Sequence, residues 1–173
     1  LYGKTIEVHN SGIRRISHYL SDKIYHVLLG QKGSFDTRLT YITVTNDDKI
    51  GRVYQLEISD ADGHNAQIVV KATYPILSPA WSPDQKKIAY VSFKNGRSEV
   101  FIKYPFMRVK PIKLPRFDGI ASAPSWHPNG QGLVLTISRE GNKDLYFYNL
   151  ESKRLIRLTK DVAIDTEANF SPD

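Results

Sequence analysis

The stretch PAWSPDQKKIAYVSF, residues 79–93, returns as PSWHPNGQGLVLTIS at residues 124–138, and a third copy begins as ANFSPD at residues 168–173. The aromatic anchors of the three copies, Trp81, Trp126 and Phe170, stand 45 and 44 residues apart. Repeats of about 40–50 residues built from short strands are typical of β-propeller blades. The spacing therefore predicts a mainly β fold made of consecutive blades.

Alternating apolar runs and polar turns complete each repeat. They predict strands at residues 87–93, 98–104 and 111–114 after the first copy, and at 133–138, 144–150 and 154–158 after the second. Asn-Gly between such runs is a strong hairpin signal, because both central residues of the tightest turns need positive φ. With the Trp-bearing segment innermost, each repeat is predicted to be a four-stranded antiparallel meander.

Both ends of the repeat region are predicted to be incomplete blades. Residues 39–45, 53–59 and 66–71 form three strand patterns with no Trp-bearing segment before them, and the third copy has no partner strands after it. Closed propellers commonly share one blade between the chain ends, because closure removes exposed strand edges. We therefore expect the natural protein to continue beyond Asp173. A further hypothesis is that two chains, head to tail, exchange terminal strands and close a six-bladed ring.

An amphipathic helix is predicted before the blades, with Asn10 or Ser11 as its cap and Gly30 at its end. A short strand is possible at residues 4–10. Residues 1–37 are interpreted as the end of an N-terminal α/β domain with a linker. The first propeller blades follow at 38–173, as a partial blade (38–72), two whole blades (73–115 and 116–159) and the start of the next (160–173). The apolar face of the helix consists of residues three or four apart, Ile13, Ile16, Leu20, Ile24, Val27 and Leu28.

The composition is that of an ordinary globular chain of 173 residues, 40% hydrophobic and 24% charged. Cysteine is absent, which excludes disulfides and thiolate metal sites. The net charge of +6 is dispersed along the chain among acidic residues, so we expect a mildly basic surface and no nucleic-acid partner. No apolar run reaches the length of about 20 residues that a membrane helix needs, so no direct membrane insertion is expected.

Ser82, Asp84 and His127 form the set that most resembles a hydrolase site. Ser82 and His127, however, occupy the same position of neighbouring repeats, so they are not expected to face each other as nucleophile and base. Asp84 corresponds to Asn129, where a tight turn favours a short side chain that bonds its own backbone. Gln85 stands where glycine is usual. We predict no catalytic residues.

Asp60, Asp62, Gly63 and Asn65 resemble the opening of a calcium loop. The twelfth position of such a loop needs a bidentate Glu, and here it holds Lys71. A hairpin turn with Gly63 at positive φ is therefore predicted, with no metal and no cofactor. The histidines show no pair at metal-ligand spacing and are interpreted as structural or surface residues: His9, His18, His26, His64 and His127.

Three segments together resemble the TolB family of the Gram-negative Tol-Pal system: SDKIYHVLLGQKGSFDTRLTYITVT (21–45), LEISDADGHNAQIVV (56–70) and SPAWSPDQKKIAYVSFKNGRSEVFI (78–102). The resemblance implies a non-enzymatic periplasmic protein with an α/β domain and a six-bladed propeller. It implies that the channel mouth binds the peptidoglycan-associated lipoprotein Pal, that the extreme N-terminus contacts TolA, and that some colicins use the protein. The implied role is outer-membrane integrity and cell division.

Connectors that lead into each innermost strand are expected at the channel mouth, at residues 73–80, 115–124 and 160–168. Ile120 departs from the family pattern, in which a polar residue is common; connectors that merely pack are the plainer alternative. An alternative for the whole protein is the propeller of a prolyl-oligopeptidase-type serine peptidase. By motif position, the resemblance implies lipoprotein contacts at Leu77, Ser78, Ile120, Ala121, Ser122, Thr166 and Glu167.

Overall fold

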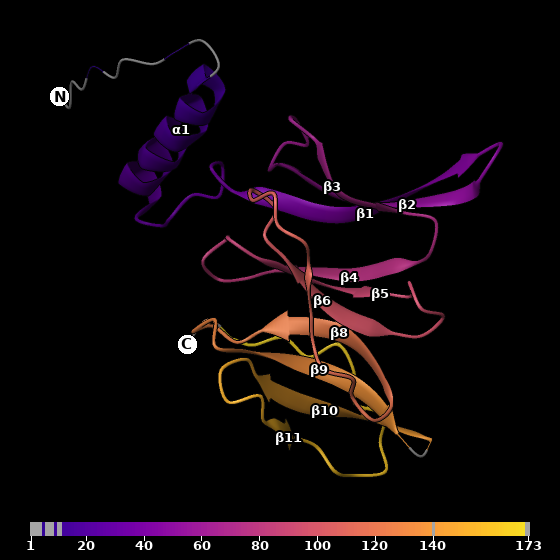
Figure 1. Cartoon of the computed structure of the whole chain (residues 1–173). Helices are drawn as coiled ribbons and strands as arrows, with labels where there is room; N and C mark the ends of the chain where they lie inside the picture. The colour runs from indigo at the N-terminus through magenta and orange to yellow at the C-terminus, as the bar shows by residue number, and fades with distance from the viewer. Residues whose placement is uncertain (1–4, 6–8, 10–11, 140, 172–173) are drawn as a thin grey trace. The chain divides into compact units, whose positions relative to one another are not determined.

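The computed structural model describes residues 5, 9, 12–139 and 141–171 (Figure 1). The chain separates into two compact units, one of residues 1–39 with 58–67 and one of residues 40–57 with 68–173. Among the described residues there is one α-helix, α1 (Ile13–Leu29), followed by strands only. The fold is therefore mainly β, as the repeat pattern predicts.

The strands form three antiparallel sheets in chain order, each a meander (Figure 1). The strands predicted at residues 39–71, 87–114 and 133–158 are all present, with ends that differ by one to two residues. Within the described residues the first sheet has three strands and no innermost one, whereas each complete repeat has four, as predicted. The sheets are β1 (Arg38–Asp47), β2 (Gly51–Asp60) and β3 (Gln67–Ala72); β4 (Ile76–Trp81), β5 (Ile88–Ser92), β6 (Glu99–Lys103) and β7 (Ile112–Lys113); and β8 (Ile120–Trp126), β9 (Gly132–Arg139), β10 (Asn142–Asn149) and β11 (Leu155–Arg157).

The turn after each innermost strand follows one design. The N–H of Gln85 donates to Ser82 O at 2.9 Å, and the N–H of Gly130 donates to His127 O at 2.8 Å. Proline is the second residue of both turns, and the fourth residue is left-handed, with φ of +56° at Gln85 and +72° at Gly130. Asn129 itself does not have positive φ, so the prediction of two left-handed residues was wrong here. In a four-residue turn closed by the N–H of its fourth residue, the two central residues keep negative φ and only the fourth residue is left-handed.

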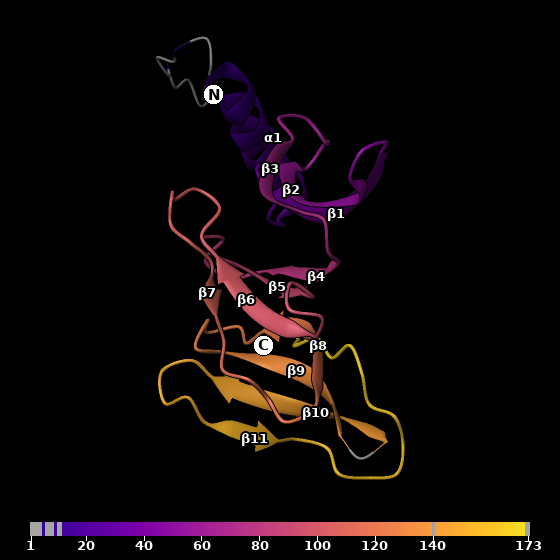
Figure 2. The same cartoon turned by 45° about the vertical axis from the view of Figure 1, so that its right-hand side comes forward.

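The apolar core of the repeats lies between the second and third sheets. Strand β8 lies against β4, β5 and β6, as both views show (Figure 2). Both sheets contribute fully buried side chains, since a meander that is apolar on both faces must bury each face against a neighbour. The cluster contains Ala89, Val100, Ile102, Leu114, Phe117, Ala121, Trp126, Leu133, Leu135, Ile137, Tyr146 and Tyr148.

A tryptophan hydrogen bond connects the two complete blades. The indole Nε1 of Trp126 donates to the backbone carbonyl of Ala80, the residue before Trp81, at 3.0 Å. Trp81 holds the same repeat position, but its Nε1 is buried and has no acceptor within the described part of the chain. The acceptor would belong to the innermost strand of the first sheet, which is the strand that this sheet lacks. One interaction is thus made in one copy of the repeat and left unmade in the other.

The third copy does not continue the strand pattern. Residues 158–171 contain no strand, so the prediction of an innermost strand there was wrong for this structure. The segment still lies beside the end of β8. The Ser125 hydroxyl is 3.3 Å from Asn169 Oδ1, and the ring centroids of His127 and Phe170 are 4.8 Å apart. A segment becomes a strand only where its backbone shares ladder hydrogen bonds with a second strand, and no described residue forms such a ladder with this segment. The hypothesis that two chains exchange terminal strands treats this segment as one of those strands, and the described part of the segment contains no strand.

Helix α1 ends as predicted but begins differently. Gly30 is left-handed, with φ of +70°, and its N–H donates to His26 O at 2.9 Å. The N-cap is Gly12 without a side-chain bond, which corrects the predicted cap; Asn10, Ser11 and most of the possible strand at 4–10 lie outside the described residues. The apolar face is exposed, 81% at Val27. Among the described residues, no helix has the length and apolar character required to cross a bilayer.

The two tryptophans give a matched stability test. Trp126→Phe leaves the partly buried carbonyl of Ala80 without its indole donor, whereas Trp81→Phe removes an N–H that has no partner among the described residues. We expect Trp126→Phe to lower the free energy of unfolding by about 1–2 kcal/mol more than Trp81→Phe does. Urea denaturation followed by circular dichroism measures both, and equal losses would show that the cross-blade bond contributes nothing.

Candidate functional site

The predicted connector residues differ in exposure. Ile120 is 61% exposed and Leu77 46%, and Ser78, Thr166 and Glu167 are also exposed. Ser122 is half-buried. Ala121 is buried in the core cluster, and its carbonyl accepts a hydrogen bond from the Ser98 hydroxyl. Ala121 therefore offers a partner little surface, and a contact there remains a prediction that the geometry does not favour.

A β-bulge recurs in the innermost strands. On β4 the register moves from Leu77 opposite Val91 to Ala80 opposite Ala89, so β4 contains one extra residue. On β8 it moves in the same way from Ser122 opposite Thr136 to Ser125 opposite Val134. A bulge bends the strand and redirects the side chains beside it. Leu77, Ser78 and Ser122, three of the predicted contact residues, therefore lie at an irregularity of their sheets.

One repeat position is left-handed in all three copies, and in β4 and β8 it lies within the bulge. Ser78, Ala123 and Glu167 have φ of +50°, +45° and +54°, and each stands three residues before its aromatic anchor. Non-glycine residues rarely adopt this conformation. The motif comparison selected Ser78 and Glu167 but missed Ala123. Its signal was available in the repeat, because Ala123 aligns with both of them.

Thr136 of β9 brings three of the predicted residues together. It lies opposite Ser122, its hydroxyl accepts the N–H of Glu167 at 3.2 Å, and the same hydroxyl lies 3.4 Å from Thr166 Oγ1. Leu77 and Ser78 belong to the preceding repeat, on β4, which β8 lies against. Thr136 thus pairs with the second connector through the β-ladder and with the third through its buried hydroxyl, and sequence comparison did not select it.

The hydrolase-like set is dispersed in separate turns. The Ser82 hydroxyl is 2% exposed, donates to Asp84 Oδ1 at 2.5 Å and accepts the N–H of Lys87 at 2.9 Å. His127 accepts the N–H of Asn129 at Nδ1, 3.2 Å away, and its ring lies beside the ring of Phe147. Ser82 thus closes the turn with hydrogen bonds on both sides of its oxygen, as a structural residue does.

The carboxyl group of Asp84 also serves the turn. Its Oδ1 accepts the N–H of Lys86 at 3.1 Å, which is the backbone bond predicted for this position. The Ser82 hydroxyl lowers the pKa of Asp84 from its ordinary value, with smaller contributions from Lys86 and Lys87, because each of them favours the ionised form. The turn is therefore most stable with Asp84 ionised.

Buried carboxylates pair with cations at one repeat position of the outer strands. Glu99 on β6 accepts Lys113 Nζ at 2.6 Å, and Asp144 on β10 accepts Arg157 Nη2 at 2.7 Å. The Lys113 ammonium lowers the pKa of Glu99. Asp144 also lines a cavity of about 690 Å³ at the end of its sheet, together with Gly119 and Arg157. These pairs join the third and fourth strands of each blade.

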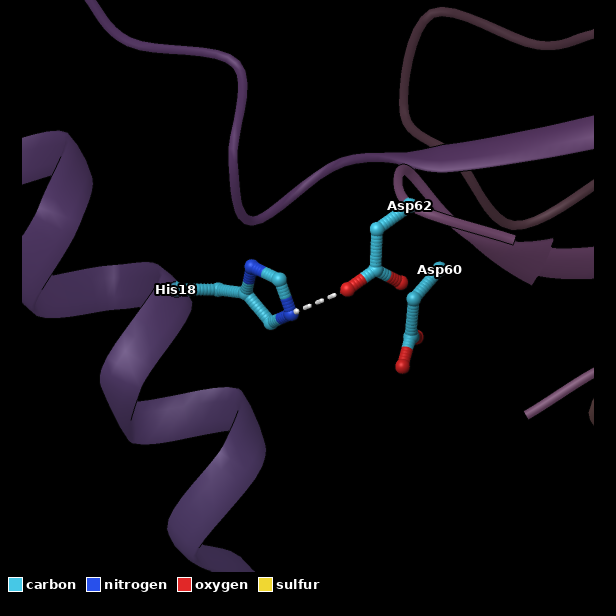
Figure 3. Close-up of side chains that lie close together, drawn as sticks. All are labelled: His18, Asp60 and Asp62. Atoms are coloured by element: carbon cyan, nitrogen blue, oxygen red, sulfur yellow. Dashed lines mark ion pairs between the residues drawn. The ribbon is translucent and has the colours of Figure 1, made fainter. Parts of the chain in front are cut away.

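A cluster of His18, Asp60 and Asp62 joins α1 to the turn after β2 (Figure 3). His18 Nε2 lies 3.5 Å from Asp62 Oδ2, and Gly63 in the turn has the predicted positive φ of +82°. Arg14 contacts both carboxylates and lies 3.6 Å from Asp60. A guanidinium group thus supplies the positive charge that a metal ion would bring. The hydrogen bond from the His64 N–H lowers the pKa of Asp62, and Arg14 and His18 add to this effect.

Comparisons with known proteins agree on one family. Residues 25–173 match the TolB beta propeller domain. A Tol-Pal system protein TolB of Ruthia magnifica is 70% identical over 161 residues, which are 93% of this chain and 38% of that protein. The crystal structure of TolB from Acinetobacter baumannii superposes with a TM-score of 0.84 at 37% identity and covers 96% of this chain and 41% of that one. The chain thus spans about two fifths of the length of these relatives.

A peptidase propeller shares only the fold. The β-propeller domain of the Trilobed protease from Pyrococcus furiosus superposes with a TM-score of 0.55 at 18% identity, over 76% of this chain and 41% of that chain. Similarity at that level reports the blade architecture and carries no information on activity.

Removal of the Ser82 hydroxyl should change the acid sensitivity of the fold. Because the folded-state pKa of Asp84 is lowered, its stabilisation is present above the unfolded pKa of about 3.9 and is lost as pH falls through the folded value. At pH 7 we expect Ser82→Ala to lower the free energy of unfolding by about 1–2 kcal/mol. The difference from wild type should narrow between about pH 5 and pH 2 in denaturant titrations. A constant difference would contradict the assigned bond.

Proposed function

Because the chain belongs to the TolB β-propeller family, we propose that it is a non-enzymatic, protein-binding part of a Tol-Pal system component in the periplasm. The family match and the relatives' names support membership of the Tol-Pal system. The partners and the compartment are our proposal. A binding role is supported by the bonding of Ser82 and Asp84, which serve a turn and do not face a catalytic base.

The proposed partner at the channel mouth is a Pal-like lipoprotein. The observation that carries this proposal is one fixed repeat position, three residues before each aromatic anchor, at which Ser78, Ala123 and Glu167 have the same left-handed backbone conformation. A rigid frame that presents different side chains on equivalent connectors is suited to recognition of a protein surface. We propose contacts at Leu77, Ser78, Ile120, Ser122, Thr166 and Glu167, and Ala123 as an addition.

For the whole protein the proposal extends to TolA and to colicins as further partners, and to outer-membrane integrity and cell division as the process served. The competing function is the propeller of a prolyl-oligopeptidase-type peptidase. The 70% identity to a Tol-Pal protein favours the first proposal, whereas the protease propeller shares 18%.

Charge and bulk at the mouth should weaken the lipoprotein complex. In the natural protein that contains these residues, we expect the double variant Ser122→Arg, Thr166→Arg to bind the periplasmic domain of Pal about tenfold more weakly or worse, because two desolvated cations would meet the interface. Isothermal titration calorimetry measures the affinity.

Val162→Arg is the matched control for this test, because Val162 is fully exposed on the same connector and lies outside the proposed contacts. Its affinity should equal that of wild type. Circular dichroism checks that all variants are folded. An unchanged affinity in the folded double variant would remove Ser122 and Thr166 from the site.

A further inference from the structure

Thr136 is a buried polar residue in the apolar stretch of β9 at residues 133–137. Its side chain is 1% exposed in the middle of β9, between Leu135 and Ile137, which are fully buried. The hydroxyl uses both of its hydrogen-bonding functions on the third connector: it accepts the N–H of Glu167 at 3.2 Å and reaches Thr166 Oγ1 at 3.4 Å. A buried hydroxyl that is bonded in this way is satisfied and directional.

The preceding blade shows that packing does not require this hydroxyl. Val91 of β5 holds the same repeat position, opposite Leu77 as Thr136 is opposite Ser122, and it is 1% exposed. Valine and threonine have nearly the same shape, so a methyl group fills this place in one blade and a hydroxyl in the other. The difference between the two blades is therefore the pair of polar contacts to the connector.

The third connector needs an added restraint where the first two do not. Ser78 and Ala123 are held left-handed inside innermost strands, with ladder pairs on both sides of the bulge. Glu167 has the same left-handed conformation, φ +54°, but lies in a segment that is not a strand. This conformation is unfavourable for a residue with a side chain. The bond from its N–H to Thr136 fixes the residue at the point where its backbone is strained.

Other bonds hold the connector further upstream. The N–H of Asp165 donates to Lys143 O at 2.9 Å, and Asn142 Nδ2 donates to Asp161 O at 2.8 Å. Loss of the Thr136 hydroxyl should therefore release residues 166 and 167 while the rest of the connector stays in place.

We propose that Thr136 is a positioning residue of the channel mouth: its buried hydroxyl sets the orientation of Thr166 and Glu167 toward the lipoprotein partner, without touching that partner. The expected effect of Thr136 on binding rests on the proposed function, because it requires that the lipoprotein binds at the channel mouth. The structural consequence, the restraint on Glu167, is independent of any partner.

The test replaces the hydroxyl alone. In the natural protein that contains this chain, Thr136→Val should speed amide hydrogen exchange at Glu167 about tenfold and weaken binding of the Pal periplasmic domain about three- to tenfold, the range that one hydrogen bond provides. Thr136→Ser retains the hydroxyl and should restore both values to within about twofold of wild type. Residue-resolved hydrogen exchange and calorimetry give the two readouts.

Thr159→Val is the matched control, because the Thr159 hydroxyl also accepts a backbone N–H, from Leu145 at 3.0 Å, on the same blade. Thr159→Val should change neither the amide exchange rate of Glu167 nor the affinity for the Pal domain. If it changes both, the effects of Thr136→Val reflect a general loss of stability, which would contradict the specific role of Thr136. Faster exchange with unchanged affinity would overturn the role of Thr136 in binding, and unchanged exchange would overturn the restraint itself. If the wild type does not bind the lipoprotein, the proposed function fails, while the exchange result still decides whether Thr136 fixes Glu167.

Discussion

A four-stranded meander that is apolar on both faces cannot be stable alone, and this constraint governs the structure. Strand β9 is buried along most of its length, and its side chains share one core cluster with Ala89, Val100 and Ile102 of the preceding sheet. The Trp126 bond to Ala80 adds a directional element to this otherwise non-directional packing. The third sheet is thereby placed against the second, and the connector between them inherits that placement.

The repeat made most of the fold predictable. The repeat period follows from the spacing of Trp81, Trp126 and Phe170. This period located the strands more reliably than local propensity could, because the same strand pattern occurs in both complete copies. Phe170 shows the limit of this inference. Its copy has the right residues but no strand, since ladder hydrogen bonds depend on a second strand that the local sequence does not contain. The cap of α1 was also mispredicted, because Gly12 precedes the helix without a side-chain bond.

The candidate site was predictable only in part. Repeat alignment correctly separated Ser82 from His127, and motif position selected Thr166 and Glu167. Thr136 was not selected, because a threonine inside a strand pattern looks like any β-branched residue until its partner is known from the three-dimensional structure. The same holds for His18, which lies more than 40 residues from Asp60 in the chain and meets it only through folding.

The three left-handed mouth residues are a serine, an alanine and a glutamate on one backbone design. Since none of them is a glycine, the conformation is imposed by the strand register or by Thr136 and does not depend on the side chain that occupies it. The backbone conformation at this position is thus independent of which side chain the position carries. The side chain at this position can therefore be exchanged in one repeat at a time while the backbone keeps its geometry.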